Sequence, residues 1–241
     1  MRASTFAGLV SLVVAGLSPR AALADPVRVD VGGGTYFPVS VAAEAMAELP
    51  FRVLLRGDVG FMPTPYSNTI VDLLGDFSVL TSFQEALLKL AIQNSLVASL
   101  SAGWRPFPAL GLEVLAGYTL VTIGGGVSGT DVIDAYLQSK GSTDRSPPDA
   151  QHDVPIAATL HNFDAGVDWR FLLLDDKLVL RASLAYMQCF ASSMSVKETS
   201  SRPASQAITS RINQEIAAQL NPYFTEYVKV PVVGVTASYR F

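Results

Sequence analysis

Few residues in this 241-residue chain belong to the types that carry out nucleophilic or acid–base catalysis. It contains two histidines, His152 and His161, and one cysteine, Cys189. Serines are so numerous that a serine–histidine–aspartate combination can be drawn in many ways, which makes any one of them uninformative. A single cysteine excludes an intrachain disulfide and a cysteine-based zinc site. We therefore expect no enzymatic activity.

Two further patterns resemble ligand sites only in part. Gly124-Gly125-Gly126 lacks the Lys-Ser/Thr pair that ends a phosphate-binding loop, so we expect it to form a flexible entrance to a loop. The aspartates between Asp131 and Asp153 lack the spacing of an EF-hand calcium loop. The sequence therefore predicts no metal site and no cofactor.

A set of charged side chains forms the strongest candidate site. Every cation in it is arginine, whose planar guanidinium can bind a carboxylate through two parallel hydrogen bonds. Seven arginines face seven carboxylates, and this balance favours ion pairs that fill an enclosed space; a selective ion path would have one sign in excess. The set comprises Arg28, Asp30, Glu44, Glu48, Arg52, Arg56, Asp58, Arg105, Glu113, Asp164, Asp168, Arg170, Arg181 and Arg240.

Composition limits the kind of protein that can hold these charges. The chain is 49% apolar and 16% charged, with a net charge of −4, whereas ordinary soluble domains are about 25% charged. Intrinsic disorder and nucleic-acid binding are excluded, because the first needs few apolar residues and the second a basic surface. The surface contains too few charges for an ordinary water-facing protein.

The first 24 residues have the pattern of a secretory signal peptide. Arg2 precedes an apolar stretch from Phe6 to Leu17, and Ala22-Leu23-Ala24 forms a small-x-small cleavage site. The stretch is too short to span a bilayer as a helix. Ser82–Leu100, the best later candidate for a spanning helix, contains Glu85 and Lys89, and charges are costly at that depth. We therefore expect a signal peptide (1–24) and one exported domain (25–241) without a spanning helix.

Period-two alternation of polar and apolar residues predicts strands along this domain. Their connections alternate between tight turns, such as the one at Pro50, and long segments at 63–94, 123–155 and 191–228. This layout predicts an all-β fold, an eight-stranded antiparallel transmembrane β-barrel with short turns at one end, long loops at the other and short helices within the loops. The strands are expected at 27–37, 40–49, 51–62, 95–105, 110–122, 156–171, 178–190 and 229–241.

Alternation alone fits two kinds of barrel, because a soluble lipocalin-like barrel has the same period with its apolar face inside. Three observations favour the membrane barrel. The polar face is rich in glycine and serine, as a narrow interior requires, and its cations are arginines, whereas a solvated face would use many lysines. Aromatic residues gather on the apolar face at the short-turn end, as an interfacial girdle would. These residues are Phe51, Trp104, Trp169, Phe171, Tyr239 and Phe241.

The C-terminus strengthens this interpretation. Val233, Val235, Ala237, Tyr239 and Phe241 alternate up to a terminal phenylalanine. This segment resembles the C-terminal strand by which outer-membrane β-barrels are recognised, and the whole domain resembles small eight-stranded bacterial outer-membrane barrels of the OmpA, OmpX and OmpW type. The resemblance implies a bacterial outer-membrane location in a Gram-negative-type envelope and contact with outer-membrane lipids. It also implies assembly by the barrel-assembly machinery, with Tyr239 and Phe241 as the signal.

Two functions remain open. The first is a non-catalytic barrel with a charge-paired, largely filled lumen, whose extracellular loops serve envelope integrity or contact a surface partner. The alternative is a narrow, porin-like channel or a binding barrel for small solutes, including a small apolar ligand at the loops. The apolar segment 70–92 would distinguish them, since it either caps the barrel or lines a cleft. No nucleic-acid partner is expected.

Overall fold

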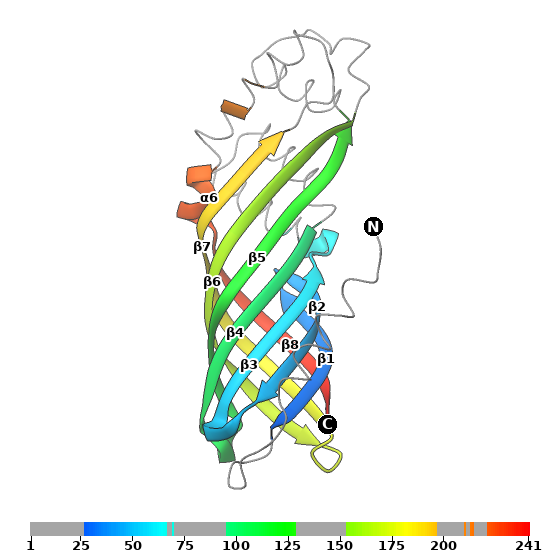
Figure 1. Ribbon diagram of the computed structural model, residues 1–241, viewed down its shortest axis with the longest axis vertical. Helices are drawn as coiled ribbons and strands as arrows, with labels where there is room; N and C mark the ends of the chain where they lie inside the picture. Colours follow the sequence, from blue (N-terminus) through cyan, green and yellow to red (C-terminus); the bar gives the residue numbers. More distant parts are fainter. Residues whose placement is uncertain are drawn as a thin grey trace.

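The computed structural model describes residues 27–66, 69, 95–128, 153–196, 210, 213–214 and 221–241. The chain forms a closed barrel of eight antiparallel strands, each paired with its neighbours in sequence, and the last strand pairs with the first (Figure 1). The predicted fold class is therefore confirmed. The strands are β1 (Arg28–Phe37), β2 (Ser40–Glu48), β3 (Val53–Phe61), β4 (Ser95–Phe107), β5 (Leu112–Ser128), β6 (Asp153–Leu173), β7 (Leu178–Val196) and β8 (Lys229–Arg240).

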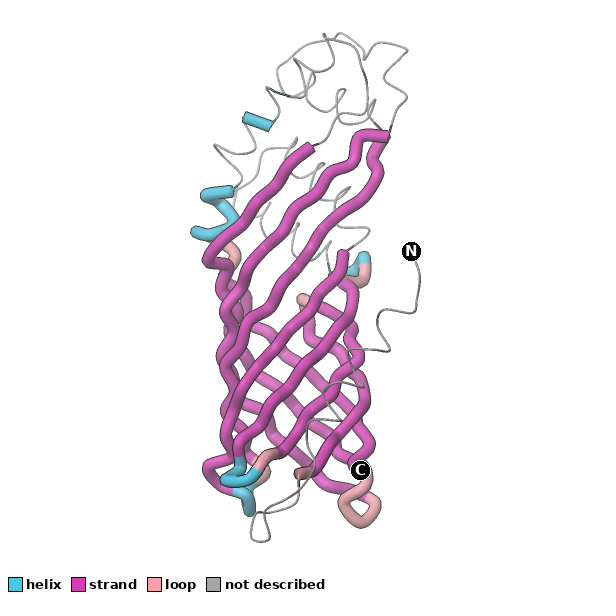
Figure 2. Tube along the Cα trace, in the orientation of Figure 1, coloured by secondary structure: helices cyan, strands magenta, loops and turns pink. Residues whose placement is uncertain are grey.

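Three short connections lie together at one end of the barrel, which we call the turn end (Figure 2). The 3-10 turn η1 (Pro50–Arg52) joins β2 to β3, η3 (Pro108–Leu110) joins β4 to β5, and residues 174–177 join β6 to β7. Gly111 ends η3 with φ of +65°, and a Cβ there would collide with the carbonyl oxygen of Arg170. The predicted tight turns are thus present at these positions.

Several predicted features lie outside the described residues, namely the signal peptide (1–24), the apolar segment 70–92 and His152. No helix among the described residues is long and apolar enough to cross a bilayer.

The strands differ in length at the end opposite the turns. β5, β6 and β7 contain 17, 21 and 19 residues, against 9 to 13 in the others, and they extend beyond the rest of the barrel (Figure 1). Gly124, Gly125 and Gly126 pair with β6 inside this extension, so the prediction that they open a loop is wrong. The short helix α6 (Asn221–Tyr227) packs beside β7, where Ser192 Oγ donates to the Asn221 carbonyl oxygen at 3.0 Å.

The strands are strongly staggered around the barrel. Tracing the paired residues from Asp58 of β3 across β4 and β5 leads to Asn162 of β6. Tracing them from Asp58 in the other direction, across β2, β1, β8 and β7, leads to Leu172 of β6. The two routes meet the same strand ten residues apart. Such a stagger tilts the strands by about 35–45°, and an eight-stranded lumen is only wide enough for side chains to fill it.

The inner and outer faces of the sheet differ in the way that a membrane barrel requires. Inward positions hold buried polar residues such as Asp30, Glu113 and Arg181, whereas outward positions hold exposed apolar ones such as Leu100 and Leu184. A soluble barrel would show the reverse. The chain is therefore a membrane-spanning barrel, and the lipocalin-like alternative is excluded.

Exposed aromatic residues lie at both ends of this apolar band. The six residues that the sequence suggests for a girdle are all exposed near the turn end. A second ring, which the sequence analysis did not identify, lies nearer the opposite end and consists of Phe37, Phe61, Tyr118, Phe163, Tyr186 and Phe190. Two aromatic girdles flanking an apolar band are typical of outer-membrane barrels.

Candidate functional site in the barrel lumen

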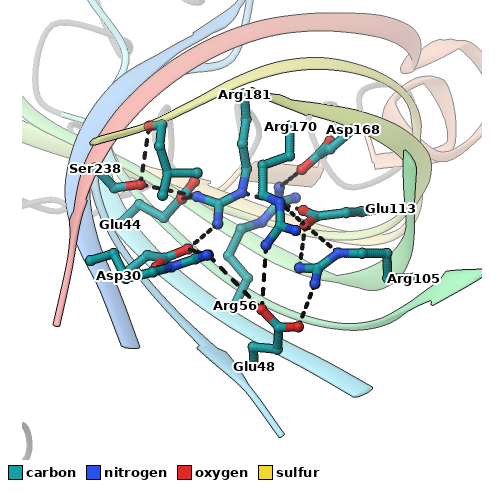
Figure 3. Close-up of polar contacts among 12 residues, drawn as sticks. Asp30, Glu44, Glu48, Arg56, Arg105, Glu113, Asp168, Arg170, Arg181 and Ser238 are labelled. Carbon is teal, nitrogen blue, oxygen red and sulfur yellow. Dashed lines mark hydrogen bonds and ion pairs between the residues drawn. The ribbon is translucent and has the colours of Figure 1, made fainter. Parts of the chain in front are cut away.

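A group of ion-paired side chains fills the lumen near the turn end (Figure 3). We call it the salt-bridge cluster. Its four arginines and four carboxylates come from seven of the eight strands, every strand except β3, so the closed barrel is what brings them together. The cluster consists of Asp30, Glu44, Glu48, Arg105, Glu113, Arg170, Arg181 and Arg240.

Arg181 lies at the centre of the cluster and is 1% exposed. Its guanidinium donates to Asp30, to Glu44 Oε1 at 3.3 Å and to Glu113 Oε2 at 3.3 Å. A further hydrogen bond runs from Nη1 to Ser238 Oγ at 3.0 Å. One arginine thus compensates three buried carboxylates, from β1, β2 and β5.

The other three arginines of the cluster compensate the remaining negative charge of its carboxylates. Arg105 donates to Glu113 Oε1 from Nε at 3.1 Å and from Nη2 at 2.7 Å, and it also donates to Glu48. Arg170 donates to Glu48 Oε2 at 3.3 Å. Arg240 and Asp30 form a two-pronged pair, at 2.7 and 2.9 Å. Buried charges are tolerated when they are paired and hydrogen-bonded in this way.

One further pair lies above the cluster, away from the turn end. Arg56 Nη1 donates to Asp168 Oδ2 at 2.6 Å, and the guanidinium carbon of Arg56 lies 5.6 Å from the centre of the Tyr36 ring. The Tyr36 hydroxyl donates to Glu44, which connects this pair to the salt-bridge cluster. Arg56 is therefore held by an ion pair and a cation–π contact together.

Asp58 and Asp164 occupy the next level of the lumen. Both line a cavity of about 50 Å³, together with Arg56 and Asp168. The Thr119 hydroxyl lies 2.8 Å from Asp164 Oδ2, in hydrogen-bonding position. Neither Asp58 nor Asp164 forms an ion pair with any residue in the described part of the chain.

Two of the arginines assigned to the lumen from the sequence are exposed and are not buried in it. Arg52 is exposed in η1 with φ of +66°, and Arg28 is exposed at the start of β1. The assignment of Arg52 fails because Phe51 and Arg52 both adopt left-handed backbone angles, so β3 begins only at Val53. The described lumen therefore holds five arginines against seven carboxylates, and the predicted balance of charge is wrong. The two unpaired carboxylates are Asp58 and Asp164.

Beyond the cavity the lumen becomes apolar, which the sequence analysis did not anticipate. Inward positions in this part are buried, and Cys189 lies among them with its thiol 3.3 Å from the Ala191 carbonyl oxygen. The signal was present in the sequence, because apolar residues occupy both faces of β5, β6 and β7 toward this end. We call the buried set the apolar collar; it comprises Val39, Val97, Val121, Ile123, Ala158, Leu160, Met187, Met194 and Val232.

His161 of β6 forms contacts with aromatic residues on the outer face. His161 Nδ1 lies 2.5 Å from the Tyr118 hydroxyl, and both rings lie 6.3 Å from Phe190. These contacts hold His161 beside the second ring of exposed aromatic residues, the one farther from the turn end. In the described ranges, no group of three or more histidine, cysteine or acidic side chains is arranged to hold a metal ion.

Comparison with known proteins yields matches among solved structures only. No family model matches the chain, and no curated protein matches it. The solved structures include a major outer membrane protein from Thermus thermophilus, with 17% identity over 90% of this chain and 100% of that one, at a TM-score of 0.49. They also include the N-terminal β-barrel domain of Pseudomonas aeruginosa OprF, with 13% identity, coverage of 89% and 96% and a TM-score of 0.39. Acinetobacter baumannii CarO matches with 13% identity, coverage of 92% and 100% and a TM-score of 0.30.

Proposed function

We propose that this chain is a non-catalytic barrel of the bacterial outer membrane, whose lumen is closed by the salt-bridge cluster and whose role is exercised at its extracellular end. It spans the outer membrane with its turn end toward the periplasm. One observation supports the proposal that the lumen is closed. Four arginines and four carboxylates, matched in number and linked by hydrogen bonds, occupy the cross-section near the turn end. An open, selective pore would instead require a continuous hydrated path.

Conductance of the refolded barrel in a planar bilayer tests the closed lumen. We expect silence, or at most small steps carried by small ions, because the salt-bridge cluster fills an already narrow barrel. Folding is confirmed beforehand by the heat-dependent shift of the band on a gel. Stable, large-conductance openings from a folded barrel would contradict the proposal.

The apolar collar favours a second candidate function. Its buried aliphatic side chains lie on the extracellular side of the cavity, and an apolar solute bound among them would go no further than the charged region. Under this alternative the chain is a binding barrel for small apolar molecules. Saturable binding of an alkyl or aromatic probe, lost on placing an aspartate at Val121, would favour it over a role confined to the loops.

The last residue provides a test of assembly. Tyr239 and Phe241 lie exposed on the outer face with ring centres 5.0 Å apart, at the end of the strand that would carry the signal. We expect Phe241→Ala to reduce the amount of folded barrel in the outer membrane of cells several-fold while refolding in detergent is unchanged. Phe51→Ala, which removes another highly exposed aromatic residue, from a turn, is the matched control. Equal losses for the two variants would argue against a specific signal.

A further inference from the structure

The cavity between the salt-bridge cluster and the apolar collar has an unbalanced wall. We call it the chamber and define it by Arg56, Asp58, Ser101, Asp164, Asp168 and Ser183, which all line it. Three carboxylates face one guanidinium there. Because Arg56 is already bound to Asp168 at 2.6 Å, the negative charges of Asp58 and Asp164 have no cation paired with them among the described residues.

This imbalance is unfavourable unless the carboxyl groups take up protons or a cation occupies the chamber. Asp58 is 7% exposed, and a buried charge without a partner costs several kcal/mol in general. The chamber is also closed toward the periplasm by the salt-bridge cluster, and Val39, Met187 and Val232 line its other side. Bulk water therefore screens the buried Asp58 poorly and the half-buried Asp164 only in part, which makes a bound counter-ion favourable.

Two buried hydroxyls provide an independent observation. Ser101 is 2% exposed and Ser183 is 6% exposed, and within the described part of the chain neither side-chain oxygen makes a close hydrogen bond. The Ser101 hydroxyl faces Asp164, and the Ser183 hydroxyl faces Asp168. A gap of this kind between two polar groups is normally bridged by a water molecule or an ion. The chamber thus offers two buried hydroxyls, beside Asp164 and Asp168, that an ion or a water molecule in the cavity could bind.

The chemistry of the wall selects the class of occupant. All the negatively charged ligands are oxygen atoms, which suit hard cations. No three acidic side chains of the described residues are grouped closely enough to chelate a metal ion directly, so the ion must keep part of its hydration. A volume of about 50 Å³ accommodates one small ion with a water molecule. A monovalent ion of the size of sodium fits these conditions.

From these observations we infer that the chamber binds one small monovalent cation, such as sodium, between the carboxylates of Asp58 and Asp164 with the hydroxyl of Ser101 as a further ligand. The site lies in the lumen and is formed only when the barrel is folded, so binding stabilises the folded state. It is independent of the proposed surface role, because it requires no loop residue and no flow of ions through the lumen.

Urea unfolding of the whole barrel in two salts tests this inference. We expect a higher midpoint in sodium chloride than in choline chloride at the same ionic strength, because choline is too large for the chamber. The difference should grow with the logarithm of the sodium concentration once the site is saturated. Equal midpoints in the two salts would overturn the inference.

Two variants test whether Asp58 and Asp164 are responsible for the effect of sodium on the unfolding midpoint. The double variant Asp58→Asn/Asp164→Asn should lose the sodium effect and unfold at a higher urea concentration than the wild type in choline chloride, since its amides repel each other less than two carboxylates. Asp175→Asn, which changes an exposed aspartate in a turn, is the matched control and should keep the full sodium effect. A double variant that retains the sodium effect would overturn the assignment.

A second measurement on the wild type covers the case in which the double variant does not fold. Thallium(I) replaces small monovalent cations and scatters X-rays anomalously. Crystals of the wild-type barrel grown with thallium(I) should show an anomalous peak between Asp58 and Asp164. A chamber without a peak, or with a peak only at the protein surface, would show that the carboxylates are neutralised by protons or water alone and would overturn the inference.

Discussion

Replacing Arg181 by alanine is expected to lower the free energy of unfolding by about 3–5 kcal/mol, the usual cost of removing one partner from a buried ion pair. Arg181 is 1% exposed and donates to Asp30, Glu44 and Glu113. Its loss leaves those three carboxylates with too little positive charge in a narrow lumen. Urea titration of the refolded barrel, followed by the gel shift and by tryptophan fluorescence, measures the effect.

Two further variants show whether the effect comes from the buried charge. Arg28→Ala removes an exposed arginine at the start of β1 and should change stability by no more than about 0.5 kcal/mol. Adding Glu44→Gln to Arg181→Ala should recover part of the loss, because Arg181 is the only arginine of the described residues that forms an ion pair with Glu44. A loss equal to that of Arg28→Ala would mean that the salt-bridge cluster does not hold the barrel together.

Replacing Leu100 by arginine is expected to lower stability in lipid vesicles by about 2–4 kcal/mol, the cost of a cation facing lipid near the middle of the bilayer. Leu100 is 66% exposed on the outer face of β4, between the two aromatic rings. In a soluble barrel an exposed leucine would tolerate this change. The prediction therefore tests the orientation of the sheet in a membrane, measured by urea unfolding in phosphatidylcholine vesicles.

Leu174→Arg is the matched control for Leu100→Arg. Leu174 is 73% exposed but lies in the turn between β6 and β7, outside the apolar band. An arginine there can reach water, so its cost should be close to zero. If both variants were equally stable, the outer face of β4 would not face lipid.

The barrel could be predicted from the sequence because its signal is repeated in every strand. Alternation with a period of two places one face inside, and Pro50 and residues 174–177 stop the alternation at tight turns. The lengths of β5 to β7 could not be predicted in the same way. Toward the extracellular end their inner positions become apolar too, so the contrast between the faces disappears while the backbone ladder continues through Gly124–Gly126.

The sequence predicts most of the charged residues of the lumen, but it does not predict the ratio of arginines to carboxylates there. Parity correctly placed Arg105, Glu113 and Arg181 on the inner face, but it could not reveal that Arg52 leaves the ladder, since that depends on the left-handed backbone of two turn residues. The identity of each ion pair also depends on the stagger between strands, which no single strand encodes. For the same reason the chamber could not be predicted from the sequence, because its lining residues come from all eight strands and meet only in the closed barrel.

The pairing of β1 with β8 has a consequence for how the chain acquires its fold. All the other strand pairs join neighbours in the sequence and can form as hairpins, whereas Asp30 and Arg240 must meet across 210 residues. The entropy of closing so long a loop has to be overcome before any of the contacts at this seam form. We therefore expect the two-pronged bond between Arg240 and Asp30 to be among the last contacts to form, after the hairpins between neighbouring strands.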